Sequence, residues 1–334
     1  MRKINISVVG ATGLVGSEFL KLLESSNINV GSLYLYASSK SIDKDIVFRN
    51  RHYKVLELDE DNLTKVDVTF LFINSSLVKK WTNKILEYSR YIIDNSSYFR
   101  SDINVPLVVP EINLNDITSN NRIIANPNCS TIQVVIILNA IRKLYKLKRV
   151  IYTTYQSVSG SGQKGIDEYD NCLKGNDNNF YPHNIIHTCI PHIDSFSDEG
   201  YTLEEYKMIN ETKKILHDDT LKVVSTCVRV PIKVGHAVSV VLELNEAFEL
   251  NKIKKLLQEE PGVVLLDDEH HNIYPTTEFI CNSNNVFVGR IRKDVSCSNG
   301  LLFYCTSNNL TRGASYNALK ILEELLLNRV LLFW

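Results

Sequence analysis

The chain has 334 residues, 44% hydrophobic and 22% charged, which is ordinary for a soluble globular protein with room for two domains. Its formal net charge of −1 lacks the basic excess that nucleic acids or anionic membrane surfaces attract. No apolar run approaches the ~20 residues that span a bilayer, and no export signal precedes the first apolar segment. We therefore expect a cytosolic protein without nucleic-acid or membrane partners.

The first segment predicts a strand, a glycine turn and a helix. Apolar residues stand at 4, 6, 8 and 9, Gly10, Gly13 and Gly16 follow, and apolar residues over 19–23 form one helix face. Such a turn lets the backbone approach a pyrophosphate, whose charge then lies at the helix N-terminus. The spacing differs from the commoner GxGxxG pattern, and a plain tight turn is the alternative reading.

Strands are also expected at 33–36, 66–73 and 91–93, with a helix over 78–88, which indicates a parallel, doubly wound sheet. The loop after the strand at 33–36 contains no acidic residue for a ribose hydroxyl. It offers hydroxyls and one cation instead: Ser38, Ser39, Lys40 and Ser41. That composition suits the 2′-phosphate of NADP, and a solvated polar loop is the alternative.

The second half of the chain changes character. Strand-like segments lie at 150–156, 223–230, 238–244, 286–292 and 301–306, and helical ones at 165–173, 203–216 and 251–258. A final amphipathic helix is expected over 312–328. We predict an α/β fold in which a Rossmann-type doubly wound parallel sheet is joined to an α+β catalytic and dimerisation domain with a mixed, mostly antiparallel sheet. The first domain covers residues 1–127, completed by 312–334, and the second covers 128–311.

Cys129 lies in the stretch 126–131, Asn-Pro-Asn-Cys-Ser-Thr, directly before an apolar run. An Asx residue can cap a helix, so the pattern predicts a loop that delivers the cysteine to the first turn of a buried helix. The positive end of the helix dipole favours thiolate, the nucleophilic form. A small buried side chain at a helix start is the alternative.

The seven cysteines contain no CxxC pair, and their number is odd. In a cytosolic chain this argues against a disulfide framework and against a structural zinc site, so no metal is expected.

Several motifs occur in one order along nearly the whole chain. They lie at residues 10–16, 94–100, 108–111, 126–131, 155–162, 204–207, 229–236, 287–294 and 307–310. This set resembles the aspartate-β-semialdehyde dehydrogenase family. The versions at 95–100 (Asn-Ser-Ser-Tyr-Phe-Arg) and 155–160 are similar to the branch typified by Gram-positive bacteria.

The resemblance implies NADPH-dependent, reversible reduction of aspartyl phosphate to aspartate semialdehyde through a cysteine thioester. This reaction serves lysine, threonine, methionine and isoleucine biosynthesis. In it Cys129 is the nucleophile, Gln156 orients the acyl intermediate and His236 is the acid–base group. The predicted substrate-binding residues are Arg229 for the carboxylate, Glu205 for the ammonium, and Arg100, Asn128 and Lys207 for phosphate. Taken one at a time, Arg100 and Lys207 could be surface charges and His236 a strand-end histidine.

The family's cofactor contacts map onto three parts of the chain: Gly10, Thr12, Gly13, Leu14, Val15 and Gly16; Ser38, Ser39, Lys40 and Ser41; and Ser159, Gly160 and Asn309. Lys40 stands where an arginine is usual. The resemblance also implies a homodimer or a dimer of dimers, although the segment before Pro191 is shorter than in typical members. The rivals are N-acetyl-γ-glutamyl-phosphate reductase, whose substrate leaves no ammonium for Glu205, and a non-catalytic NADP-binding regulator.

Overall fold

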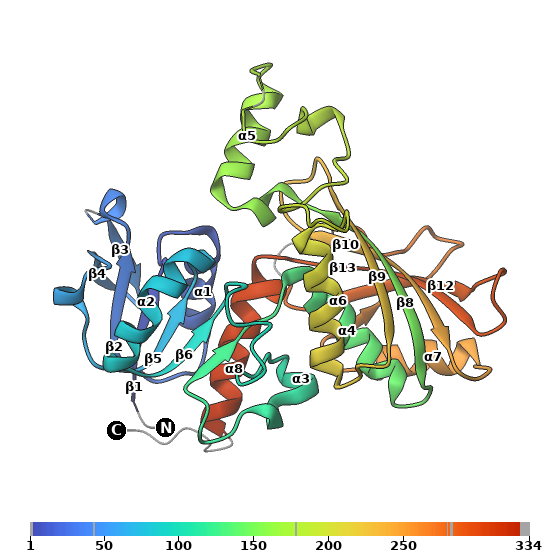
Figure 1. Ribbon diagram of the computed structural model, residues 1–334, viewed down its shortest axis with the longest axis horizontal. Coiled ribbons are helices and arrows are strands. Elements are labelled where there is room, and N and C mark those ends of the chain that lie inside the picture. Colours follow the sequence, from blue (N-terminus) through green and yellow to red (C-terminus); the bar gives the residue numbers. More distant parts are fainter. Residues whose placement is uncertain (1–2, 43, 178, 279, 281–282, 328–334) are drawn as a thin grey trace. The chain divides into compact units, whose positions relative to one another are not determined.

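The computed structural model describes residues 3–42, 44–177, 179–278, 280 and 283–327. The chain divides into two compact units (Figure 1). Unit 1 comprises residues 1–127 and 314–334, and unit 2 comprises residues 128–313. Each unit is built around its own sheet.

The sheet of unit 1 has seven strands in the order β3-β4-β2-β1-β5-β6-β7, and every neighbouring pair is parallel except β3 with β4. The strands are β1 (Ile4–Val9), β2 (Val30–Ala37), β3 (Asp45–Phe48), β4 (Arg51–Glu57), β5 (Val66–Leu71), β6 (Ser89–Asp94) and β7 (Ile123–Ala125). The predicted doubly wound parallel sheet is confirmed. β5 is buried along its whole length, as expected for a strand covered on both faces.

Helices cover both faces of this sheet. They are α1 (Leu14–Ser25), α2 (Ser75–Tyr88), the single turn α3 (Pro110–Asn113) and α8 (Tyr316–Leu327). One core cluster joins the sheet to α1 and α8, and a second, around Val78 and Ile85, joins its other face to α2. The final helix thus packs on the first sheet. The helix proper begins at Tyr316, after a π-helical stretch at Thr311–Ser315, and the part of the prediction beyond residue 327 lies outside the described residues.

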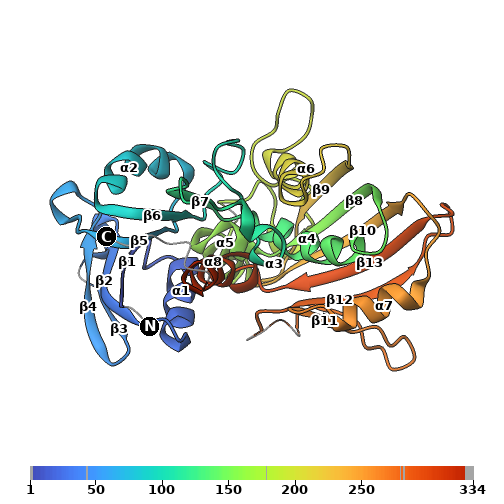
Figure 2. The same cartoon turned by 90° about the horizontal axis from the view of Figure 1, so that it is seen from below.

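The sheet of unit 2 has six strands in the order β11-β12-β13-β10-β8-β9 (Figure 2). They are β8 (Leu147–Gln156), β9 (Lys222–Arg229), β10 (His236–Leu244), β11 (Val263–Leu265), β12 (Val286–Lys293) and β13 (Gly300–Ser307). Three of its five neighbouring pairs are antiparallel, which confirms a mixed, mostly antiparallel sheet.

Helices pack on one face of this sheet. α4 (Cys129–Arg142) contacts β8, β10 and β13, and it lies between α6 (Leu203–Leu216) and α7 (Leu250–Glu259). The Tyr152 hydroxyl meets Thr212 of α6, so the buried residues of β8 face these helices. The other face of β8, carrying Ile151, Thr153 and Tyr155, is only partly buried.

α6 has strong sequence signals at both ends. Thr202 and Glu205 form a reciprocal capping box at its start, and His217 takes a left-handed conformation, with φ of 52°, at its end. The fourth helix of the unit, α5 (Gln163–Leu173), follows a glycine turn and packs with Ile185 and Ile190 in a small core of its own (Figure 1).

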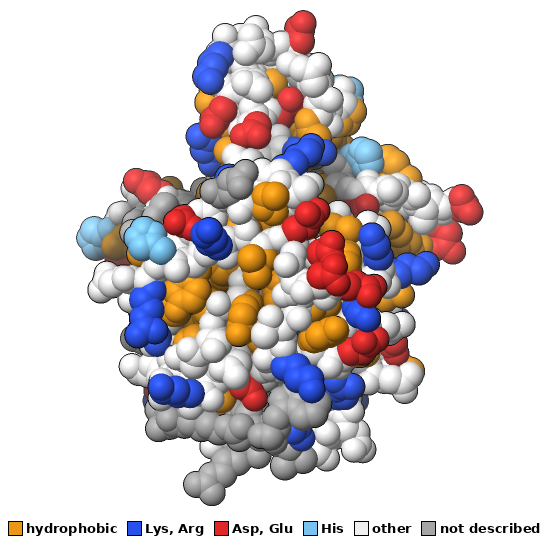
Figure 3. All heavy atoms as spheres, turned by 90° about the vertical axis from the view of Figure 1, so that its left-hand side faces the viewer, with side chains coloured by type: hydrophobic (Ala, Val, Ile, Leu, Met, Phe, Trp, Pro, Cys, Tyr) orange, Lys and Arg blue, Asp and Glu red, His pale blue; other side chains and the backbone are white. Residues whose placement is uncertain are grey.

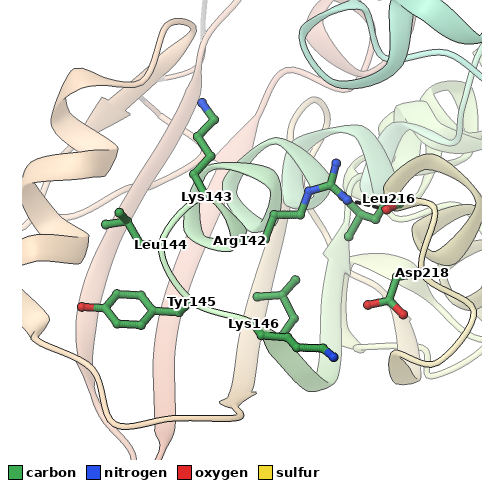
Figure 4. A pocket seen from close by; sticks show the side chains of 8 residues that line it. Arg142, Lys143, Leu144, Tyr145, Lys146, Leu216 and Asp218 are labelled. Carbon is green, nitrogen blue, oxygen red and sulfur yellow. Dashed lines mark hydrogen bonds between the residues drawn. The ribbon is translucent and has the colours of Figure 1, made fainter.

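A pocket of about 290 Å³ lies where α4 ends (Figure 4). The Arg142 guanidinium at this end donates to Leu216 O, the last carbonyl of α6, and to Asn139 Oδ1. Arg142 thus satisfies one of the carbonyl groups that the end of α6 leaves without an intrahelical partner. Its role here is structural.

No helix in the described part of the chain is long and apolar enough to cross a membrane. On the face that Figure 3 draws, Lys and Arg side chains are interspersed with Asp and Glu.

Candidate active site

Three of the predicted site residues lie in one row across the unit 2 sheet. Gln156 ends β8, Arg229 ends β9 and His236 begins β10, and Gln156 pairs directly with both of the others. Residues directly opposite each other in a sheet point to the same face. The strand register therefore places three polar side chains together at one end of the sheet, and all three are buried.

Cys129 is the first residue of α4, as predicted. The Asn128 side chain caps this helix by accepting hydrogen bonds from the backbone N–H groups of Ser130 and Thr131, at 2.8 and 3.3 Å. Every residue of α4 from Ser130 to Ile141 is buried, whereas Cys129 is partly exposed. The helix is thus anchored along its length and presents the thiol at its positive end.

Other thiols in unit 2 differ from Cys129 in their surroundings. Burial raises the pKa of the Cys227 thiol to about 12 and also raises the pKa of Cys305. The raised pKa keeps both groups protonated, and a protonated thiol is a poor nucleophile. Gly313 packs closely against Cys129, because a Cβ atom at Gly313 would lie 2.7 Å from the Cys129 Cβ, so no larger residue fits there.

A buried carboxylate joins α6 to this row. Glu204 Oε1 accepts hydrogen bonds from Asn128 Nδ2 at 2.8 Å and Gln156 Nε2 at 3.2 Å, and Oε2 accepts from Lys207 Nζ at 3.1 Å. Burial alone would raise the pKa of Glu204, but the Lys207 charge and these hydrogen bonds outweigh it and lower the pKa to about 2. Glu204 is an anion at neutral pH.

Glu205, the predicted partner of the substrate ammonium, lies in the capping box of α6. Its carboxylate accepts from the backbone N–H of Thr202 at 2.8 Å, closing the capping box, and from that of Cys227 at 3.1 Å. Successive helix residues point about 100° apart, so only one of the two adjacent glutamates can face Gln156. That residue is Glu204.

Lys207 lies one turn after Glu204 on the same helix face. Besides Glu204, its ammonium contacts Asp194 Oδ2 at 2.7 Å. Asp194 belongs to the loop before α6 and has a left-handed backbone, with φ of 70°. Asn128 and Lys207 are thereby brought together around Glu204.

His236 is fully buried, and its ring has two different edges. Nδ1 lies 3.0 Å from the backbone N of Ser157 and 3.1 Å from the Ser157 hydroxyl. Nε2 has no hydrogen-bond partner within the described residues. Burial, and then the neighbouring Arg229, lower the pKa of His236 to about 3, so the imidazole is neutral.

Arg229 is buried and donates from Nη1 to the Ser157 carbonyl at 2.7 Å. A Cβ atom at Gly160 would lie 2.7 Å from Arg229 Nη1 and 3.1 Å from His236 Nε2. Arg229 and His236 thus pack closely against Gly160, where no larger residue fits.

Ser159 and Asn309, predicted as cofactor contacts, form hydrogen bonds with each other and with residues next to His236. Asn309 Oδ1 accepts from the hydroxyls of Ser157 and Ser159 and from the backbone N–H of Gly235. Asn309 Nδ2 in turn donates to Ser159 Oγ at 3.0 Å. One buried amide therefore joins the loops that flank β8, β10 and β13.

The remaining predicted cofactor contacts lie in unit 1, where the glycine turn has the expected form. Gly10 has φ of +85°, and a Cβ there would lie 2.4 Å from Phe72 O, so only glycine fits. Gly16 packs against Gly10 in the same way. Gly13 is the N-cap of α1 and provides no side-chain cap, which leaves the first turn open to an anion such as a pyrophosphate. The first turn itself contains the other predicted contacts, Leu14 and Val15, and Thr12 precedes it.

The loop after β2 also fits a phosphate. Ser38 precedes the single 3₁₀ turn Ser39–Ser41, which contains no acidic residue and carries Lys40. Ser38, Ser39 and Lys40 are exposed. Arg100, the last predicted phosphate ligand, donates from Nη2 to Asn95 O at 2.8 Å within unit 1.

Sequence reasoning missed two further acids near Cys129. Glu204 is the first, and Glu211 is the second: its Oε2 accepts from the Asn128 backbone N–H at 2.6 Å. The spacing of Glu204, Lys207 and Glu211 repeats at i, i+3 and i+7, the pattern of one helix face. That periodicity was the available signal for choosing Glu204 over Glu205.

Comparison with known proteins agrees with this arrangement. Residues 5–120 match the family model described as semialdehyde dehydrogenase, NAD binding domain, and residues 138–312 match semialdehyde dehydrogenase, dimerisation domain. Aspartate-semialdehyde dehydrogenase of Bacillus subtilis is 41% identical, covering 97% of this chain and 98% of the relative. That of Aquifex aeolicus is also 41% identical, over 96% and 97%. The chain belongs to the aspartate-semialdehyde dehydrogenase family.

Solved structures of this family have the same fold as this chain. Aspartate semialdehyde dehydrogenase II from Vibrio cholerae, complexed with ASA, superposes with a TM-score of 0.92 at 36% identity, covering 98% of this chain and 99% of that one. The aspartate semialdehyde dehydrogenase of Candida albicans, solved with NADP, has the same fold, with a TM-score of 0.79 at 23% identity. Relatives from different bacterial groups have equal identities, so the Gram-positive branch stays a prediction.

Proposed function

We propose that this family member is an NADP-dependent, phosphorylating aspartate-semialdehyde dehydrogenase that interconverts aspartyl phosphate and aspartate semialdehyde in the cytoplasm. The observation that carries the proposal is the row Arg229–Gln156–His236, with the anion Glu204 hydrogen-bonded to its centre. An amino acid offers one carboxylate and one ammonium. Arg229 and Glu204 are the buried cation and anion that match them.

Each of these residues has one task in the proposed reaction. Cys129 Sγ attacks the β-carbonyl carbon of aspartyl phosphate, the bond from that carbon to the phosphate oxygen breaks, and a thioester remains. Gln156 orients the acyl group, Arg229 pairs with the α-carboxylate and Glu204 with the ammonium. Asn128 and Lys207 border the phosphate, and Arg100 in unit 1 remains a predicted phosphate ligand.

The cofactor we propose is NADP, held by unit 1. When bound, this cofactor would supply the hydride that the reduction requires. Gly10, Gly13 and Gly16 leave room for the pyrophosphate, and the uncapped first turn of α1 faces it with N–H groups. Ser38, Ser39, Lys40 and Ser41 form the subsite for the 2′-phosphate.

The test is phosphate-dependent reduction of NADP with aspartate semialdehyde. N-acetylglutamate semialdehyde, tested alongside, distinguishes the closest rival, N-acetyl-γ-glutamyl-phosphate reductase. Glu204 favours the substrate with a free ammonium, because an acetylated nitrogen carries no charge to pair with a buried carboxylate. Faster turnover of the acetylated substrate would favour the reductase. If neither substrate is turned over, the non-catalytic NADP-binding regulator is the alternative that remains.

We further propose a homodimer that forms through the partly exposed face of the unit 2 sheet. Along β8, β9, β10 and β13 this face presents mostly apolar and small polar side chains: Ile151, Thr153, Tyr155, Val224, Val228, Ser239, Val241, Leu302 and Tyr304. The region lies within the segment that matches a dimerisation domain. An apolar sheet face of this kind is suited to burial against a second copy.

A further inference from the structure

We propose that Tyr181 is a positioning residue for the loop of residues 157–162, and that Glu168 of α5 holds Tyr181 in place for this task. The inference rests on the proposed function, because Ser159 and Gly160 of this loop are predicted contacts of the proposed cofactor, NADP. Neither Tyr181 nor Glu168 has a task in the proposed reaction itself.

The start of the loop is held by the chain that joins β9 to β10. The backbone N–H groups of Val158 and Ser159 donate to the carbonyls of Ile232 and Lys233, at 2.8 and 3.1 Å respectively. The Ser159 hydroxyl also donates to Asn309 Oδ1 at 3.2 Å. These contacts fix residues 158 and 159, and the end of the loop needs a separate support.

Tyr181 supplies the support at the end of the loop. Its hydroxyl donates a hydrogen bond to Ser161 Oγ at 3.0 Å and lies 3.5 Å from the Val158 carbonyl oxygen. Burial raises the pKa of Tyr181, so the hydroxyl keeps its proton and remains a donor. A Cβ atom at Gly165 would lie 2.7 Å from the Tyr181 hydroxyl oxygen, so only glycine at this position of α5 lets the hydroxyl come so close.

Glu168 fixes the backbone that carries Tyr181. The described residues around Tyr181 form no helix or strand, so their N–H groups have no regular ladder to join. Glu168 is buried in α5, and its Oε1 accepts hydrogen bonds from three successive N–H groups, at 2.7, 2.8 and 3.4 Å: those of Asn179, Phe180 and Tyr181. One side chain thus orders an otherwise irregular stretch of chain.

The segment that contains α5 meets the candidate site at a second place. Ile190 exchanges two backbone hydrogen bonds with Arg229, at 2.8 and 2.9 Å. Val158 of the loop packs with Ile185 in the small core around α5. The segment therefore supports both the loop and the end of β9. A loop that is ordered before its ligand arrives lowers the entropy cost of binding, so Tyr181 should strengthen cofactor binding without touching the cofactor.

Hydrogen exchange of the full chain tests this role without turnover. Four backbone N–H groups of the loop are hydrogen-bonded, so their exchange rates report how often the loop opens: those of Val158, Ser159, Gly160 and Gly162. Tyr181→Phe removes one oxygen and keeps the ring. It should accelerate these rates by ~3- to 10-fold, the effect of losing one neutral hydrogen bond.

Tyr169→Phe is the matched control. Tyr169 packs in the same small core as Tyr181, but its hydroxyl has no hydrogen-bond partner among the described residues. This variant should leave the exchange of the loop unchanged. Unchanged exchange in Tyr181→Phe, equal acceleration in both variants, or acceleration that extends over β8 and β10 would overturn the proposal.

NADP binding, measured by isothermal titration calorimetry, tests the consequence for the cofactor. The Kd should rise ~3- to 10-fold in Tyr181→Phe and stay within about twofold in Tyr169→Phe. The alkylation rate of Cys129 by iodoacetamide should stay unchanged in both, because the contacts that hold the start of α4 come from α6. An unchanged Kd in Tyr181→Phe, or an altered rate at Cys129, would refute the positioning role. If the parent does not bind NADP, the proposed cofactor fails, while hydrogen exchange still decides the role of Tyr181.

Glu168→Gln tests whether the acid acts through Tyr181. Glutamine keeps the shape of the side chain but is a weaker acceptor, so exchange of the loop should accelerate as it does in Tyr181→Phe. If Glu168 acts through Tyr181, the double variant should exchange no faster than the faster of the two single variants. Effects that multiply in the double variant would show that the two residues act separately, and would refute the role of Glu168.

Discussion

At the scale of single residues, two adjacent glutamates of α6 have different roles: one contacts the candidate site, and the other stabilises the helix. Glu204 contacts Gln156, Asn128 and Lys207, while Glu205 caps its own helix and holds the Cys227 N–H. Two residues of the same type differ in role because successive helix positions point in different directions.

We predict that Glu204→Gln raises KM for aspartate semialdehyde by ~10- to 100-fold. Losing a charge-assisted contact typically costs about 1.5–3 kcal/mol. The matched variant Glu205→Gln should stay within about twofold of the parent, because glutamine also closes a capping box. Steady-state kinetics of both variants decide this, and a larger effect at Glu205 would return the ammonium role to it.

Cys129→Ser should lower kcat by about 10³-fold or more while the fold is retained. A serine hydroxyl is a weaker nucleophile and would form an ester in place of a thioester. Cys189→Ser, at an exposed thiol, is the control and should keep full activity. Circular dichroism checks the fold, and turnover of Cys129→Ser within tenfold of the parent would refute the nucleophile.

Lys40→Ala should lower kcat/KM for NADP by ~10- to 100-fold and leave that for NAD unchanged, because only NADP carries the 2′-phosphate. Lys44→Ala, a nearby lysine outside the 3₁₀ turn, serves as the control. Equal losses with both cofactors would mean that Lys40 does not read the 2′-phosphate.

At the scale of elements, α4 and α6 are joined by buried polar contacts. Glu204 and Glu211 of α6 both bind Asn128, the cap of α4, through its side chain and its backbone respectively. The position of Cys129 therefore depends on α6, which lies more than 70 residues away in sequence. Neither helix alone fixes the site.

The link between these helices predicts a pH dependence of stability. Because the folded-state pKa of Glu204 is lowered to about 2, its contribution is complete above its ordinary value near 4.5 and is lost as pH falls towards 2. The contribution is on the order of 3 kcal/mol. The difference in unfolding free energy between the parent and Glu204→Gln should therefore shrink between pH 5 and pH 2. Denaturant titrations measure it, and a difference that does not change with pH would contradict the assignment.

At the scale of the whole molecule, the two faces of the unit 2 sheet differ. One is covered by α4, α6 and α7, and the other presents the partly exposed residues of β8, β9, β10 and β13. The match to a dimerisation domain extends over both.

Val241→Asp should therefore dissociate the dimer, since a carboxylate buried without a partner costs several kcal/mol. Light scattering should find the mass of one 38.1 kDa chain in place of two. Val47→Asp, at a 55% exposed valine of β3, should leave the mass unchanged. A Val241→Asp protein that remains dimeric would move the interface elsewhere.

Much of this protein was determined by local sequence. The glycine turn at Gly10, the capped start of α4 at Asn128 and the strand periods of both sheets follow from backbone sterics, capping and alternation, which act over a few residues. The strands β3, β4, β7 and β11 were missed because their local patterns were weak.

Only the tertiary structure decided which polar groups meet. The register of β8 with β9 and β10 aligns Gln156 with Arg229 and His236, and the rotation of α6 selects Glu204 over Glu205. The state of His236 depends on a backbone N–H from Ser157, 79 positions earlier. Such contacts depend on strand register and helix rotation, which are set by packing across the whole unit, so no local pattern encodes them.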